Sequence, residues 1–176
     1  MMPVGPLMIE HRRIERMITI IGREFDRIQD EKKVNPAKID IFVDFIRFYA
    51  DRCHHGKEED ILFRDLIKKD ISEEHRKTMD ELIAEHQWSR KKTAQLVDAN
   101  RSYKGGDKKS ISIIADCLGA LNDFYPRHID KEDRGFFIPV MSYFSTEEKK
   151  AMLEESYAFD RKLIHEKYED MVSHME

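Results

Sequence analysis

The chain has 176 residues, of which 38% are charged and 40% hydrophobic, and its formal net charge is −4. This length fits one domain with its own core, and the charge gives no indication of a nucleic-acid partner or an anionic membrane surface. No run of about 20 apolar residues occurs, so no transmembrane segment is expected. Only seven glycines and five prolines occur, which favours long helices over a many-stranded sheet.

The cysteines and the first residues indicate the compartment. Cys53 and Cys117 lie far apart in the sequence and form no CxxC motif. Two cysteines in a chain of this size do not make a disulfide scaffold, so a reducing environment is the simpler location. The first residues lack the basic segment of a signal peptide and become charged at Glu10. We therefore expect a cytoplasmic protein.

The first two predicted helices precede Lys69. Apolar residues recur at spacings of three, four and seven over residues 6–31, which predicts one long helix with an apolar face. Asn35 followed by Pro36 is a helix start signal, because asparagine caps well and proline suits the first helical position. The second helix is predicted from this signal to about Lys69.

The next two predicted helices are separated by a pair of glycines. Ser72 can cap a third helix that runs to about Tyr103, before Gly105–Gly106 interrupts the pattern. A fourth helix is predicted over residues 107–143. Pro126 lies inside it and is expected to kink the helix or to loosen one turn.

A capping box predicts one more helix. Ser145 with Glu148 can exchange hydrogen bonds at a helix start, and the helix that follows is expected to end near Ser173. Four long antiparallel helices with short loops predict an all-α fold, an up-down-up-down four-helix bundle over residues 1–145. Residues 146–176 then form an additional C-terminal helix that packs on the bundle or extends it.

The first half of the chain carries a pattern of histidines and carboxylates. Glu10 and His11 lie on the first predicted helix. His54 follows on the second helix, with Glu58 four residues later and Phe63 nine residues later. Residues four apart lie on the same helix face, so His54 and Glu58 are expected to point in one direction.

The second half repeats this pattern. Glu85 and His86 lie on the third predicted helix, and His128 follows on the fourth, with Glu132 four residues later and Phe137 nine residues later. The spacing between the two histidines of each half is 43 residues in the first half and 42 in the second. The chain is therefore interpreted as a duplicated helical hairpin.

The duplication predicts a metal site in the bundle core. Two histidine–glutamate pairs can face each other, and a histidine from each of the other two helices completes the ring. Buried carboxylates are costly unless they are paired, and two in one core repel each other. A pair of cations bridged by Glu58 and Glu132 resolves both problems. Imidazole and carboxylate ligands suit iron, manganese, zinc or cobalt.

Several neighbouring residues leave alternatives open. His55 and Glu59 form a second pair four apart, but adjacent residues on an α-helix are about 100° apart, so His55 is interpreted as flanking the site. Asp133 follows Glu132 and is the alternative ligand at that position. Cys53 is adjacent to a predicted ligand and is interpreted as a buried, inert thiol. Three histidines have no counterpart in the repeat and are predicted to lie on the surface: His75, His165 and His174.

Four segments resemble hemerythrin-like proteins of the HHE cation-binding family: MIEH at 8–11, HHGKEEDILF at 54–63, EHQWSR at 85–90 and HIDKEDRGFF at 128–137. Members of this family are four-helix bundles that hold a non-haem di-iron centre through histidines and bridging carboxylates. The resemblance implies two iron ions as cofactor, with zinc or manganese as substitutes. It assigns the metal ligand roles to His11, His54, Glu58, His86, His128 and Glu132.

One ligand differs from the oxygen carriers of this family, which have two histidines four apart on the third helix. Here the positions four residues from His86 are Leu82 and Arg90. A missing ligand leaves a coordination position open, so we expect a non-catalytic protein that binds or senses oxygen, nitric oxide or peroxide. The alternatives are a di-iron redox enzyme acting on peroxide or nitric oxide, iron storage or donation for metal-centre repair, and a structural zinc-binding bundle.

The remaining partner predictions follow from the same observations. We expect a small ligand and neither nucleic acid nor a membrane as partner. The C-terminal helix, which carries Met152, Phe159 and Leu163 among many charged residues, has two candidate roles. It either caps the bundle or forms the contacts of a homodimer.

Overall fold

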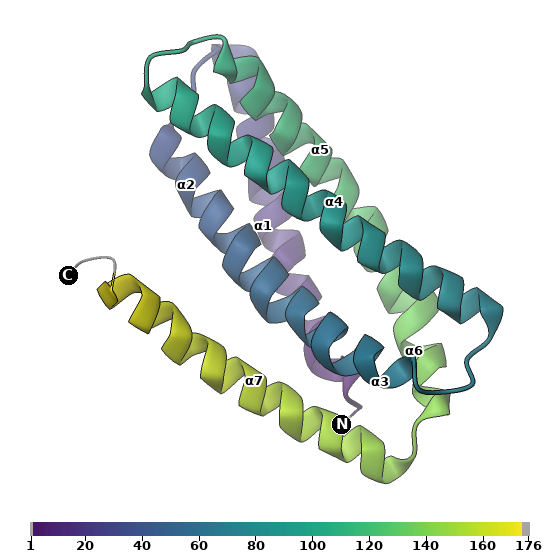
Figure 1. Ribbon diagram of the computed structural model, residues 1–176. Helices are drawn as coiled ribbons and strands as arrows, with labels where there is room; N and C mark the ends of the chain where they lie inside the picture. The colour runs from purple at the N-terminus through teal and green to yellow at the C-terminus, as the bar shows by residue number, and fades with distance from the viewer. Residues whose placement is uncertain (1, 174–176) are drawn as a thin grey trace.

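The computed structural model describes residues 2–173 and forms an antiparallel bundle of four long helical rods (Figure 1). The first rod is α1 (Val4–Glu31). The second begins with α2 (Pro36–Asp44) and continues through the π-helices η1 (Phe45–His55) and η2 (Glu58–Phe63) into α3 (Arg64–Leu66). The predicted first two helices are therefore confirmed, but the second contains wide π-helical turns that the sequence did not indicate.

The third rod is α4 (Glu73–Lys104). The fourth begins with α5 (Ser110–Asp130), which continues through Pro126 without a break, and passes into the π-helix η3 (Lys131–Phe136). It ends in α6 (Phe137–Val140) and the short 3-10 helix η4 (Met141–Tyr143). No strand occurs within residues 2–173, so the predicted all-α bundle is confirmed.

The predicted helix starts have the expected caps. The Ser72 hydroxyl accepts a hydrogen bond from the backbone N–H of His75 at 3.2 Å. The Ser145 backbone N–H donates to the Glu148 carboxylate at 2.8 Å, and the Glu148 N–H donates to the Ser145 hydroxyl at 3.2 Å. Each cap pairs backbone donors that a helix start otherwise leaves unpaired.

α7 (Thr146–Ser173) lies along the outside of the bundle and contacts η1 and η2 (Figure 1). Its approach is close, because a Cβ atom added to Gly56 would lie 2.9 Å from the ring of Phe159. Arg64 and Glu155 fix the same face through two hydrogen bonds of 2.7 and 2.9 Å. Within the described residues no helix is both long and apolar enough to span a membrane.

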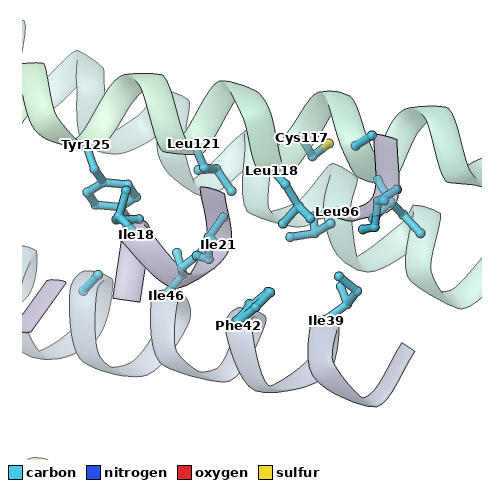
Figure 2. Close-up of a cluster of buried hydrophobic side chains, with 14 of the residues drawn as sticks. Ile18, Ile21, Ile39, Phe42, Ile46, Leu96, Cys117, Leu118, Leu121 and Tyr125 are labelled. Atoms are coloured by element: carbon cyan, nitrogen blue, oxygen red, sulfur yellow. The ribbon is translucent and has the colours of Figure 1, made fainter. Parts of the chain in front are cut away.

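Two apolar clusters fill the bundle, one on each side of a polar layer. Figure 2 shows the larger cluster, in which Ile18, Phe42, Leu96 and Leu121 from the four rods meet. The smaller cluster lies towards α3 and α6. Burying one such side chain contributes about 1.5–3 kcal/mol. These clusters therefore provide the stability that offsets the burial of charged groups between them.

Candidate metal centre

The structure brings all six predicted site residues together between the two apolar clusters. The histidines come from α1, η1, α4 and α5, and the two glutamates from η2 and η3. All six are at most 2% exposed. They are His11, His54, Glu58, His86, His128 and Glu132.

Glu58 lies between histidines of the two halves. Its Oε1 atom is 3.2 Å from Nε2 of His54, and its Oε2 atom is 3.3 Å from Nε2 of His86. One carboxylate therefore presents an oxygen to each half of the duplicated chain.

Glu132 has the equivalent position. Its Oε2 atom is 3.1 Å from Nε2 of His11, and its Oε1 atom is 3.4 Å from Nε2 of His128. Two candidate metal positions result, one beside His11 and His54 and the other beside His86 and His128. Each glutamate has one oxygen directed at each position, which is the geometry of a bridging ligand.

His55 belongs to the second position, and the interpretation that it flanks the site was wrong. It is 1% exposed, its ring stacks on His86 with centroids 3.9 Å apart, and its nitrogens lie within ligating range of those of His86 and His128. The cause is the π-helix η1. Its i to i+5 hydrogen bonds widen the turn. Adjacent side chains are therefore separated by a smaller angle around the helix axis than in an α-helix, where that angle is about 100°. His54 and His55 therefore both point inward.

Within each half of the chain, a carboxylate on one rod orients a histidine on the next rod. Nδ1 of His54 donates a hydrogen bond to Glu10 at 3.0 Å, and Nδ1 of His128 donates to Glu85 at 2.7 Å. Because the carboxylates only accept, each Nδ1 carries a proton, and Nε2 is the nitrogen that faces the centre. Glu10 and Glu85 are the acidic residues of the two repeated Glu-His pairs, whose role the sequence left unassigned.

Two further carboxylates connect the halves. Nδ1 of His86 donates to Glu59 at 2.7 Å, and Nδ1 of His11 donates to Asp133 at 2.7 Å. Asp133 thus lies on the outer nitrogen of His11, while Glu132 occupies the inner position. The sequence did not assign this role to Glu59 or Asp133. An acidic residue directly after Glu58 and directly after Glu132 was the signal that could have indicated it.

The inner atoms of this cluster fit a cation. Nε2 of His11 and Nε2 of His54 lie 2.8 Å apart, so without an ion one of the two rings must carry a second proton and donate it to the other. Among the described residues, nine buried side-chain atoms have no hydrogen-bond partner, and eight of them belong to this cluster. Buried polar atoms are rarely left unpaired, so an ion that accepts electron pairs from all sides is the species that satisfies them.

The comparison with protein families agrees with this geometry. The family described as hemerythrin HHE cation binding domain matches residues 2–137. The chain belongs to this family. No curated protein and no solved structure matches the chain. The family assignment covers the four-rod bundle up to the start of α6 and leaves α7 outside, and it establishes this hemerythrin-like chain as a cation-binding protein.

Protons on imidazoles balance the charge of the two glutamates in this hemerythrin-like bundle when no cation is bound. Burial lowers the pKa of His54, but the charge of Glu58 and the hydrogen bond to Glu10 outweigh burial and raise it to about 10. For His86, burial is likewise outweighed by the nearby carboxylates of Glu132 and Glu58, and the pKa rises to about 11. Burial raises the pKa of Glu58, but the two histidines hold it well below its ordinary value. A bound metal ion would replace these protons.

Arg90, four residues after His86, contacts carboxylates around the centre rather than the centre itself. Its guanidinium donates to Asp51 at 2.7 Å and to Glu59 at 2.9 Å. Leu82 is fully buried in the smaller apolar cluster. Neither position offers a ligand atom to the centre, and the additional imidazole in the cluster is that of His55 on the second rod.

The three histidines without counterparts lie away from the centre where the structure describes them. Nδ1 of His75 is hydrogen-bonded to the hydroxyl of Tyr143 at 2.9 Å, and His165 is exposed on α7. His174 lies outside the described residues. The surface prediction therefore holds for His165, whereas His75 is half-buried.

A cavity of about 670 Å³ opens between α4 and α5. His128 and Glu85 form part of its lining, together with Trp88 and Phe124. The Phe124 ring stacks on His128 with centroids 5.1 Å apart, and Trp88 lies against Phe124 at 4.7 Å. The cavity therefore connects the surface with a residue of the centre.

Proposed function

We propose that the centre holds two iron ions and that the protein binds or senses oxygen or a related small oxidant. The observation that carries this proposal is the group of eight unpaired buried atoms that belong to one cluster of the described residues. His11 and His54 would hold one ion, and His55, His86 and His128 the other. Glu58 and Glu132 would bridge the two ions.

Iron bound by imidazoles and carboxylates supplies redox chemistry and leaves coordination positions that a small ligand can take. Side chains around the site orient its histidines and exclude water. The carboxylates on Nδ1 of His11, His54, His86 and His128 fix the tautomer and direction of each ring. Phe137 stacks on His11 at 5.6 Å and Phe63 on His86 at 6.1 Å, which excludes water from one side of the centre.

The cavity at His128 leaves room for a small ligand to approach the centre. Oxygen, nitric oxide, peroxide and azide are far smaller than the about 670 Å³ available, and none of them needs a shaped pocket for recognition. Inclusion of His55 gives seven metal-ligating residues, so ligand number alone does not separate sensing from reversible carriage. The reaction with oxygen separates them.

The experiment is an elemental analysis of protein purified without added metal, followed by visible spectroscopy with azide. The proposal predicts two iron ions per chain and a new charge-transfer band when azide is added to the oxidised protein. Two zinc ions and no visible spectrum would contradict it and support a structural bundle. Iron without any response to azide or oxygen would instead support storage.

Stopped-flow mixing of the di-ferrous protein with oxygen distinguishes the remaining functions. A sensor or redox protein is expected to oxidise after brief oxygen binding. A stable adduct that releases oxygen on evacuation would restore oxygen carriage, and turnover of peroxide or nitric oxide would support the enzyme.

A further inference from the structure

A buried lysine connects α7 with the metal centre. Lys57 is 1% exposed, and its ammonium group donates hydrogen bonds to Glu10 and, at 2.7 Å, to Asp160 of α7. Glu10 in turn accepts the hydrogen bond from Nδ1 of His54 at 3.0 Å. A continuous chain of hydrogen bonds therefore runs from α7 to an imidazole of the centre.

The same lysine explains a third cluster of metal-ligating side chains, formed by Glu10, Cys53 and Asp160. The Lys57 ammonium already lies between the two carboxylates as their cation. Burial raises the pKa of the Cys53 thiol to about 12, so the thiol stays protonated and donates to Asp160 at 3.4 Å. This cluster is therefore an ion-pair network with a buried thiol at its edge, and the predicted burial of Cys53 is confirmed.

The other half of the centre provides an internal comparison. Lys131 precedes Glu132 as Lys57 precedes Glu58, and it donates to Glu85, the carboxylate that orients His128. Its second acceptor is Glu81 at 3.3 Å, which lies on α4 of the same half. In the first half that outer carboxylate comes instead from α7, beyond the residues that the family comparison matches.

We propose that Asp160 is a positioning residue for His54, so that α7 forms part of the metal centre and controls one of its two metal positions. The inference rests on the proposed two-metal site. Without Asp160 the buried ammonium of Lys57 would draw on Glu10 alone and reduce the negative charge that Glu10 offers to the His54 N–H. Carboxylates behind a ligating histidine fix its orientation and raise its basicity, so a weaker partner weakens the metal bond.

The test compares metal release in full-length variants loaded with two Co²⁺ ions, whose visible absorption is followed after a chelator is added. In Asp160→Asn, one of the two equivalents is expected to leave about tenfold faster and the other at the wild-type rate. Asp160→Glu should restore the wild-type rates. Glu81→Gln is the matched control, because it should accelerate the other equivalent. Equal acceleration of both equivalents by Asp160→Asn, or of neither, would overturn the proposal.

A second variant separates positioning from a merely structural role of α7. In Lys57→Met no ammonium draws on Glu10, so release of the same equivalent should be no faster than in the wild type. Adding Asp160→Asn to this variant should change the rate by less than about twofold, because coupled residues are not additive. An effect of Asp160→Asn that persists in full without Lys57 would overturn the proposal. Wild-type protein that binds fewer than two Co²⁺ ions contradicts the proposed two-metal site itself. Two bound ions with unchanged release in the variants contradict only the role of Asp160.

Discussion

The two halves of the metal centre share their inner residues but differ on their outer sides. In the first half, Lys57 and Glu10 lie beneath α7, where Asp160 closes the hydrogen-bond chain. In the second half, Glu85 and Lys131 line a cavity that is open to the surface. The two hairpins of the duplicated chain therefore keep the same inner residues, although their outer surroundings differ. The first half is covered by α7, and the second half is accessible from the surface.

The inner layer has one difference as well. His55 points into the centre, whereas the corresponding residue of the second half, Ile129, is 3% exposed and belongs to the larger apolar cluster. The position beside His86 and His128 therefore has three imidazoles, and the position beside His11 and His54 has two. Unequal ligand sets predict unequal affinities for the two ions.

The largest effect is expected from the residues that both halves share. Replacing Glu58 or Glu132 by Ala should lose both metal ions, because each carboxylate directs one oxygen at each position. Elemental analysis measures the loss. Circular dichroism should show that helical content persists, since the apolar clusters are unchanged. A Glu132→Ala protein that keeps two ions would show that Glu132 is not a bridge, and Asp133→Ala would then be tested next.

Removal of His55 should affect metal binding in one half of the centre only. His55→Ala is expected to lose or weaken one metal equivalent, the one beside His86 and His128, and to leave the other in place. Metal titration followed by elemental analysis measures this. The control is the triple variant of the remaining histidines, His75, His165 and His174, which should bind as the wild type does. If His55→Ala retained full occupancy, the second position would not depend on this ring.

Replacing the carboxylates that accept hydrogen bonds from the histidine Nδ1 atoms should weaken metal binding less. Glu10→Gln and Glu85→Gln are each expected to weaken one metal equivalent by about 10- to 100-fold, because each removes the charge behind one ligating histidine. Competition with a chelator of known affinity measures both. The two variants should act on different equivalents and combine additively. Loss of the same equivalent in both variants would contradict the division of the centre into two halves.

The smallest effect is expected when the cavity is partly filled, and it concerns the rate of ligand binding only. Ala120 lines it away from the centre, and Ala120→Leu should fill part of the volume and slow azide binding several-fold without changing metal content. Stopped-flow absorbance measures the rate. Ala151→Leu on α7, which lines a separate pocket, is the matched control. An unchanged azide rate in Ala120→Leu would mean that small ligands enter by another route.

Sequence alone predicted much of this fold because the relevant signals are local. The caps at Ser72 and at Ser145 with Glu148 act within one turn, so the sequence predicts where those helices begin. The six inward residues followed from a spacing of four and its repetition. Their burial in one cluster needed only that the two hairpins face each other.

The features that the sequence did not predict depend on two things: departures from regular α-helical geometry, and the way the helices pack against one another. His55 was misplaced because the π-helix η1 changes the angle between neighbouring side chains, and no residue type in that segment indicates a wide turn. The pairing of Glu59 with His86 joins the two halves, so it requires the assembled bundle. The position of Asp160 beside Lys57 depends on how α7 packs, which its amphipathic pattern left open.

The most direct test of the two-position centre is the anomalous-difference map of a crystal of the protein loaded with iron. We expect two peaks in the bundle core, with Glu58 and Glu132 in contact with both. One peak should lie against His11 and His54, and the other against the remaining three imidazoles. A single peak, or two peaks of which neither touches both glutamates, would contradict the account.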